Sequence, residues 1–93
     1  MTVWKSTISA IEQRITISIP KGSKFLTVKA QHGNIAIWYA VPDVNARKMS
    51  VDFLVCITGA WMNLPFEIQK YWGTIHEEGY ALHVFEILSE SDE

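Results

Sequence analysis

Cysteine is nearly absent from this 93-residue chain, and long apolar runs are missing. Cys56 stands alone, so no internal disulfide can form, and no basic-then-apolar signal segment opens the chain; both features predict a protein of a reducing cytoplasm. The longest uncharged stretches, such as residues 53–65, include Thr, Asn and Gly and fall short of the roughly 20 apolar residues that a membrane-spanning helix needs. We therefore expect a soluble protein that does not insert into a membrane.

Catalytic and cofactor-binding signatures are also missing. None of the five glycines forms the run that cradles a phosphate at the start of a helix. His32, His76 and His83 lack the spacing of a zinc site, so we predict no metal and no cofactor, with a weak pairing of His76 and His83 as the alternative. Cys56 lies between apolar residues and is interpreted as a small buried hydrophobe rather than a nucleophile. The sequence disfavours an enzyme.

The chain does contain enough apolar residues for a core, since 48% of it is hydrophobic and 19% charged. Its length corresponds to one domain, which we place at residues 1–88, followed by a disordered acidic tail at residues 89–93. Apolar residues recur with period two, which is typical of half-buried strands. They do so at residues 3–10, 14–19, 25–31, 35–41, 50–57, 70–76 and 80–88. We predict an all-β fold, a small antiparallel sandwich or partly open barrel of about six to seven strands, with one short helix considered at residues 65–71.

Turn residues predict how the strands pair. His32-Gly33-Asn34 and the glycine of residues 77–79 favour tight hairpins, and we expect a third hairpin between the first two strands, around residues 11–13. The strands at residues 35–41 and 50–57 are apolar on both faces, so they should be central or covered at an interface, and a homodimer or larger assembly is favoured. The aromatic residues of the strand patterns are interpreted as core; they are Trp4, Trp38, Phe53 and Phe85.

The charges are unevenly distributed along the chain. Up to Ser50 there are seven basic residues and two acidic ones, and after Ser50 there are one basic residue and eight acidic ones. If the halves stayed apart in the fold, the molecule would have a basic side and an acidic side suited to charged partners. Because β folds usually pair early strands with late ones, we expect the charges to mix instead. The formal net charge of −2 disfavours nucleic acid as a partner.

Two groups of residues are candidates for binding. The first is an apolar loop, interpreted either as a lid over the core or as a protein interface that two basic residues of another loop would assist. Its residues are Trp61, Met62, Leu64 and Phe66, with Arg47 and Lys48 as the basic residues. The second would hold a small anionic ligand between aromatic rings and basic side chains. It consists of Trp72 and Tyr80 with the same Arg47 and Lys48. Cross-strand packing of the two aromatic residues is the stronger interpretation.

Turn glycines and aromatic residues follow one another in a distinctive order. The order is Trp4-Lys5, Pro20-Lys21-Gly22-Ser23, Leu26-Thr27-Val28, Gln31-His32-Gly33-Asn34, Trp38, Thr58-Gly59, Trp72-Gly73-Thr74 and His83-Val84-Phe85-Glu86. In this order the chain resembles, over nearly its whole length, a family of small uncharacterised bacteriophage proteins. Members of that family place a further Gly and a His after the Thr-Gly motif, whereas this chain has Ala60 and Trp61. No catalytic residues carry over from the family.

The resemblance implies a phage accessory protein acting in the host cytoplasm. Small phage proteins without catalytic motifs act by stoichiometric binding, which implies a host protein as partner and an anti-defence role such as inhibition of a CRISPR effector. One alternative is an oligomeric sponge that sequesters a nucleotide immune signal. A second alternative is a structural or assembly protein of the virion.

Overall fold

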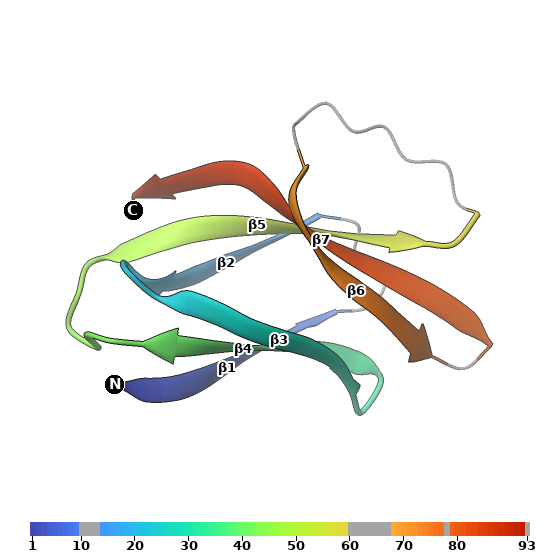
Figure 1. Cartoon of the computed structure of the whole chain (residues 1–93), viewed down its shortest axis with the longest axis horizontal. Coiled ribbons are helices and arrows are strands. Elements are labelled where there is room, and N and C mark those ends of the chain that lie inside the picture. The colour runs from blue at the N-terminus through green and yellow to red at the C-terminus, as the bar shows by residue number, and fades with distance from the viewer. Residues whose placement is uncertain (10–13, 60–67, 78, 93) are drawn as a thin grey trace.

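A computed structural model describes residues 1–9, 14–59, 68–77 and 79–92, of which residues 69, 77, 80 and 88–92 are described by their backbone alone. The described ranges form seven strands (Figure 1). The strands are β1 (Thr2–Ser9), β2 (Arg14–Pro20), β3 (Lys24–Gln31), β4 (Asn34–Val41), β5 (Lys48–Ile57), β6 (Ile68–Glu77) and β7 (Tyr80–Asp92). No helix of the length and apolarity that a membrane crossing requires occurs in these ranges.

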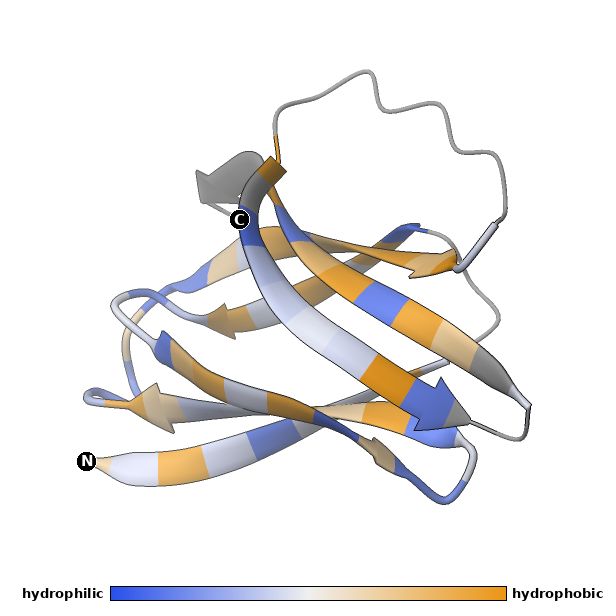
Figure 2. Ribbon diagram, turned by 45° about the vertical axis from the view of Figure 1, so that its right-hand side comes forward, coloured by the Kyte–Doolittle hydropathy of each residue, from blue (hydrophilic) through white to orange (hydrophobic). Residues whose placement is uncertain are grey.

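The strands form two antiparallel sheets that face each other. The three-stranded sheet has the order β1-β4-β3, and the four-stranded sheet has the order β2-β5-β7-β6. Edge strands β3 and β6 come into contact on one side of the molecule, but the sheets do not close into a barrel (Figure 1). Hydrophobic and hydrophilic residues alternate along β3 and β7 (Figure 2), so each sheet turns an apolar face inward. The predicted all-β sandwich is confirmed.

Two of the three predicted hairpins are confirmed and one is wrong. β3 and β4 pair through a turn in which His32 and Gly33 take φ values of 51° and 80°, and β6 pairs with β7 around Gly79. The expected hairpin between β1 and β2 does not form, because β1 pairs with β4 and β2 pairs with β5. Residues 10–13 contain neither Gly nor Asn for a tight turn. The two strands instead join different sheets, and each turns its isoleucines into the core from its own side.

Two further predictions need correction. A short helix was considered at residues 65–71, but Ile68 to Tyr71 belong to strand β6. Residues 65–67 lie outside the described ranges. The last strand was predicted to end at residue 88, but β7 continues to Asp92 and pairs Ser91 with Ser50. Backbone hydrogen bonds of a sheet need no apolar side chain, so the polar composition of residues 89–92 does not prevent pairing.

The core lies between the two central strands. Ile35, Ile37 and Val41 of β4 are fully buried, as are Val51 and Phe53 of β5. The Phe25 ring of β3 meets the Phe53 ring edge to face, with centroids 5.0 Å apart, and so joins the sheets. The predicted central positions of β4 and β5 are therefore confirmed.

The aromatic residues predicted as core divide into two groups. Phe53 is fully buried, and Trp4 is partly buried against the core cluster. Trp38 follows Ile37 of the core, so its side chain lies on the outer face of the three-stranded sheet, and Phe85 lies likewise on the outer face of the four-stranded sheet. The prediction is wrong for Trp38 and Phe85, because strands that are apolar on both faces do not reveal which face turns inward.

Candidate binding surface

The outer face of the three-stranded sheet is built from alternate residues of β1, β4 and β3. Trp38 lies at its centre, with Lys5 of β1 and Thr27 of β3 opposite it in register. Ala36 and Ala40 are the neighbours of Trp38 on the same face of β4; both are buried, and Trp38 is half-buried. The outer face thus has one large aromatic side chain at its middle.

A hollow of about 310 Å³ lies beside Trp38, with Val3, Leu26, Thr27 and Lys29 as its other lining residues. Val3 is 54% exposed and Leu26 is 48% exposed. Leu26 reaches this surface because a bulge between Phe25 and Thr27 inserts it as an extra residue in β3. Exposed aliphatic side chains around an aromatic ring are typical of a binding surface.

The three-stranded sheet carries charge of one sign only. Its strands contain Lys5, Lys24 and Lys29 and not a single Asp or Glu. Lys5 reaches across β4, where its Nζ donates to Gln31 Oε1 at 2.7 Å. Lys29, at the rim of the hollow, makes no hydrogen bond or ion pair within the described ranges. All strands of this sheet come from the basic half of the chain, so the expected mixing of charges does not occur here.

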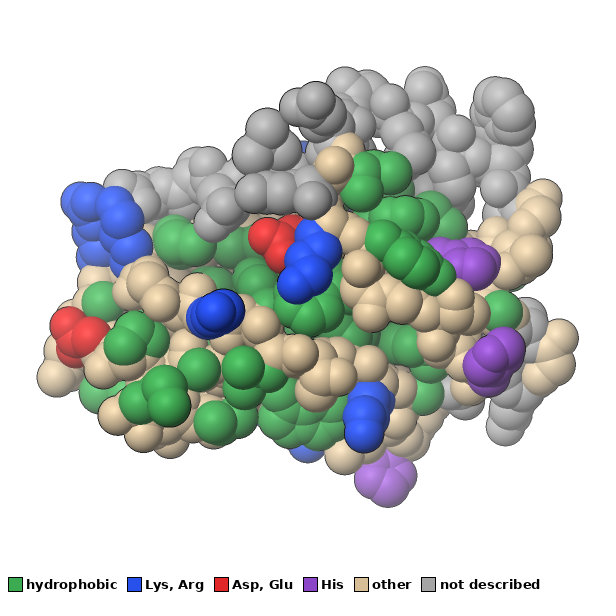
Figure 3. Space-filling view, in the orientation of Figure 1, with side chains coloured by type: hydrophobic (Ala, Val, Ile, Leu, Met, Phe, Trp, Pro, Cys, Tyr) green, Lys and Arg blue, Asp and Glu red, His purple; other side chains and the backbone are tan. Residues whose placement is uncertain are grey.

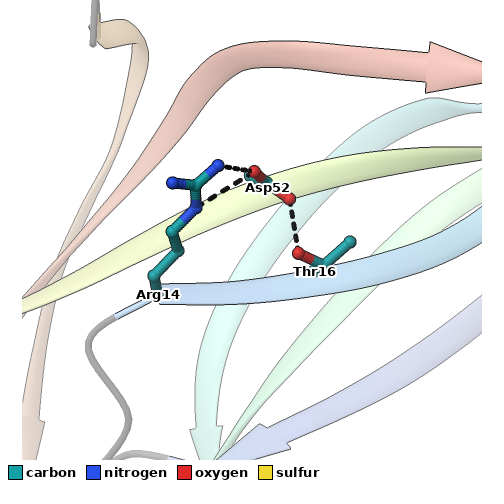
Figure 4. A network of polar contacts seen from close by, with 3 residues as sticks. All are labelled: Arg14, Thr16 and Asp52. Carbon is teal, nitrogen blue, oxygen red and sulfur yellow. Dashed lines mark hydrogen bonds and ion pairs between the residues drawn. The ribbon is translucent and has the colours of Figure 1, made fainter. Parts of the chain in front are cut away.

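The outer face of the four-stranded sheet differs, because its polar groups satisfy one another. Asp52 of β5 is only 5% exposed, and its carboxylate accepts hydrogen bonds from Arg14 Nε at 3.1 Å and Thr16 Oγ1 at 2.6 Å (Figure 4). The Arg14 guanidinium also forms an ion pair with the same carboxylate. A buried carboxylate needs such partners to offset its lost hydration. This network therefore serves the fold.

A second polar cluster on the four-stranded sheet surrounds His83. Its Nε2 lies 2.5 Å from Thr58 Oγ1, and its Nδ1 lies 3.1 Å from the Tyr71 hydroxyl and 3.2 Å from Thr74 Oγ1. Cys56 is the register partner of His83, and burial raises the pKa of its thiol. Because the thiolate is the reactive form, a raised pKa disfavours nucleophilic chemistry at Cys56. Both imidazole nitrogens are held by hydroxyl groups, as expected of a structural histidine.

The two histidines of the predicted pair, His76 and His83, are diagonal neighbours on the β6–β7 hairpin. His76 lies on the same outer face as His83, but its register partner is Ala81, and that of His83 is Thr74. No three His, Cys, Asp or Glu side chains of the described residues gather into a group that could hold a metal ion.

The residues predicted for a protein interface fall in two places. Trp61, Met62, Leu64 and Phe66 lie outside the described residues. Arg47 ends the loop before β5, where its carbonyl oxygen accepts a hydrogen bond from the Lys21 backbone N–H at 2.8 Å. Lys48 follows at the start of β5, with its Nζ 5.1 Å from the centre of the Trp4 ring.

The two aromatic residues predicted to stack a ligand lie at different places along the β6–β7 hairpin. Trp72 lies beside a bulge in β6, near Val84 and Phe85 of β7. The Tyr80 backbone pairs with Glu77 at the far end of the same hairpin. Four residues separate Tyr80 from Val84, which corresponds to about 13 Å along the strand. A ligand stacked by these two residues stays a prediction.

The sequence contains a signal for the surface around Trp38. The outward set of β4, Ala36, Trp38 and Ala40, is apolar, which indicated either a central strand or an interface. A three-stranded sheet leaves that face without a second layer among the described residues. The strand order confirms that β4 is the central strand of its sheet, and the interface on its outer face stays a prediction.

The whole chain, residues 1–93, matches a family described as a domain of unknown function, DUF7352. The chain belongs to the DUF7352 family. No curated protein and no solved structure gives a match. Membership of DUF7352 supports the expectation that the similarity spans the whole chain, whereas the bacteriophage origin stays a prediction. The binding surface around Trp38 has therefore to be interpreted from its own chemistry.

Proposed function

We propose that this DUF7352 protein is a non-catalytic binding protein whose outer three-stranded face docks an acidic protein partner. The observation that carries the proposal is the apolar group formed by the exposed Val3 and Leu26 and the half-buried Trp38, within a sheet whose charged residues are all lysines. Apolar side chains at the centre supply buried area, and the lysines at the rim favour a partner of negative charge. An acidic protein matches both features.

The phage resemblance supplies the setting of the proposal. In that setting the partner is a host protein, and a defence component such as a CRISPR effector is the preferred target in the host cytoplasm. The interface predicted at Trp61 to Phe66 stays a prediction beside it, as do the homo-oligomer and the virion role. Nucleic acid would also be attracted by lysines, but the formal net charge of −2 disfavours it as the partner.

The test reverses one charge on the proposed surface and one elsewhere. Lys29→Glu places a carboxylate at the rim of the hollow, and Lys21→Glu makes the same change in net charge in the exposed turn after β2. Each variant and the wild type are immobilised and exposed to extract of the native host, and the retained protein is then purified and titrated. We expect Lys29→Glu to weaken binding about tenfold or more and Lys21→Glu to leave it within about twofold.

Two further results check the same proposal. Wild-type affinity should fall as salt is raised, because rim charges are screened, and Trp38→Ala should weaken binding at every salt concentration, because it removes the apolar centre. Unchanged affinity in folded Lys29→Glu and Trp38→Ala would show that the partner docks elsewhere.

A further inference from the structure

A second hollow opens between the sheets, at the end where β3 meets β6. Its volume is about 230 Å³, and its lining residues are Ser23, Lys24, Phe25, Met49, Lys70, Trp72 and Glu86. Basic and acidic side chains gather over hydrophobic surface in the middle of the face seen in Figure 3. Phe25, Met49 and Trp72 pack against the core and give this groove an apolar floor. The groove lies away from the hollow beside Trp38, with which it shares no lining residue.

Trp72 holds two opposite charges apart in this groove. Lys70 and Glu86 are register partners on β6 and β7, an arrangement that usually favours a cross-strand ion pair. The Trp72 Nε1–H instead donates to Glu86 Oε1 at 3.1 Å, and the Lys70 ammonium lies over the Trp72 ring, 4.0 Å from its centre. No ion pair joins Lys70 to Glu86 in the described part of the chain. Each charge therefore keeps hydrogen-bonding capacity toward the groove.

Lys24 adds a second ammonium-bearing side chain to the same lining. It makes no hydrogen bond or ion pair with any described residue. Two lysines and one glutamate leave the groove with one excess positive charge, which favours an anion. Glu86 accepts hydrogen bonds only, so it favours a ligand that also carries N–H or O–H donors.

We propose that the groove binds a small organic phosphate that carries hydrogen-bond donors. The phosphate contacts Lys70 and Lys24, the donors contact the free oxygen of Glu86, and the remainder of the ligand lies against Phe25 and Met49. Trp72 is a positioning residue, because it keeps Lys70 and Glu86 from neutralising each other. A volume of 230 Å³ equals roughly eight water-sized groups, so the ligand enters with its phosphate and one neighbouring ring or sugar only.

The test compares three probes by isothermal titration calorimetry, in chloride buffer at up to about 10 mM ligand. Ribose 5-phosphate and adenosine monophosphate carry donors beside the phosphate, and inorganic phosphate serves as the reference anion. We expect either organic phosphate to bind at least about fivefold more tightly than inorganic phosphate, because only its sugar hydroxyls can donate to Glu86 while the phosphate contacts the lysines. Tighter binding of adenosine monophosphate than of ribose 5-phosphate would identify a nucleotide, and equal binding a sugar phosphate.

Variants then separate positioning from packing. Trp72→Phe keeps a ring but removes the N–H that holds Glu86, so Lys70 pairs with Glu86 and affinity for ribose 5-phosphate falls about tenfold. Trp72→Phe should also weaken the binding of inorganic phosphate, because Lys70 is then paired. Adding Glu86→Gln to Trp72→Phe removes the competing carboxylate, so the affinity for inorganic phosphate should return toward the wild-type value. A purely structural role for Trp72 does not predict this recovery. Lys70→Gln should lower the affinity for all three probes.

Three results overturn the proposal. They are no binding of any probe, wild-type affinity in Trp72→Phe, and equal affinity for inorganic and organic phosphate, which means an adventitious anion only. Trp38→Ala and Lys29→Glu lie on the other surface and should leave phosphate binding unchanged. Lys70→Gln should leave docking of the acidic protein unchanged, so the failure of one proposal is distinguishable from that of the other.

Discussion

The two outer faces of the sandwich differ in whether their polar side chains have hydrogen-bond partners. On the four-stranded sheet, the carboxylate of Asp52 is buried with Arg14 and Thr16 as partners, and both nitrogens of His83 meet hydroxyl groups. On the three-stranded sheet, Lys29 lies at the rim of an apolar hollow and makes no hydrogen bond or ion pair with any described residue. Paired groups stabilise the fold, whereas unpaired charge around exposed apolar area favours binding. This difference is our reason for proposing the three-stranded face as the binding surface.

The largest effect should come from comparing a core aromatic residue with the one on the surface. Phe53→Ala empties a fully buried position between the sheets and should lower the free energy of unfolding by about 3–5 kcal/mol. Trp38→Ala removes a half-buried ring, and we expect it to lower the free energy of unfolding by about 1 kcal/mol or less. Urea denaturation of both variants measures the difference. Equal losses would mean that Trp38 belongs to the core.

The next effect compares a polar residue from each outer face. Asp52→Ala removes the carboxylate that accepts charge-assisted hydrogen bonds from Arg14 and should cost about 1.5–3 kcal/mol of unfolding free energy. Lys29→Ala removes an exposed side chain and should stay within about 0.5 kcal/mol of the wild type. Thermal denaturation of the two variants side by side provides the measurement. A larger cost for Lys29→Ala would remove the contrast between the faces.

The smallest effect concerns Cys56, the thiol on the outer face of the four-stranded sheet. Burial raises its pKa, so the folded protein holds the thiol proton at a pH where the unfolded chain has released it. Its contribution to stability is full below the unfolded thiol pKa of about 8.5 and declines as the pH rises from there to the folded pKa. The stability of the wild type relative to Cys56→Ala should therefore fall as the pH rises above about 8.5, and it should stop falling once the pH has passed the raised pKa of the folded state. A constant difference would contradict the burial of the thiol.

The reactivity of Cys56 provides an independent check of the same pKa. Iodoacetamide should modify the folded protein more slowly than the urea-unfolded chain at about pH 8, because fewer thiolates are present. A faster reaction in the folded state would point to an activated cysteine instead.

Most of the fold could be predicted from the sequence because period-two alternation is a local signal. Apolar residues on both faces predicted that β4 and β5 are central strands. The turn at Gly33 was predictable because glycine tolerates the positive φ that this turn requires and that Gly33 adopts. The partners of β1 and β2 could not be predicted this way, since their alternation fits one sheet or two. That choice depends on contacts between distant residues, which no local pattern contains.

The candidate sites were harder to predict than the strands. Trp38 looked like a core residue because the identity of the buried face depends on strand order, and the extra exposure of Leu26 depends on a bulge. Trp72 was predicted as a ligand residue, but its relation to Lys70 and Glu86 depends on the irregular register of β6 and β7. Chemistry that arises from pairing register becomes visible only when the sheets are assembled.

Site-specific photocrosslinking in the native host tests the proposed binding surface most directly. A photoreactive amino acid is placed at Thr27, beside Trp38, or at His76, an exposed position on the outer face of the four-stranded sheet. We predict a covalent adduct with another, acidic protein from position 27 and none from position 76. Adducts from position 76 alone, or none from position 27, would contradict a docking role for the three-stranded sheet.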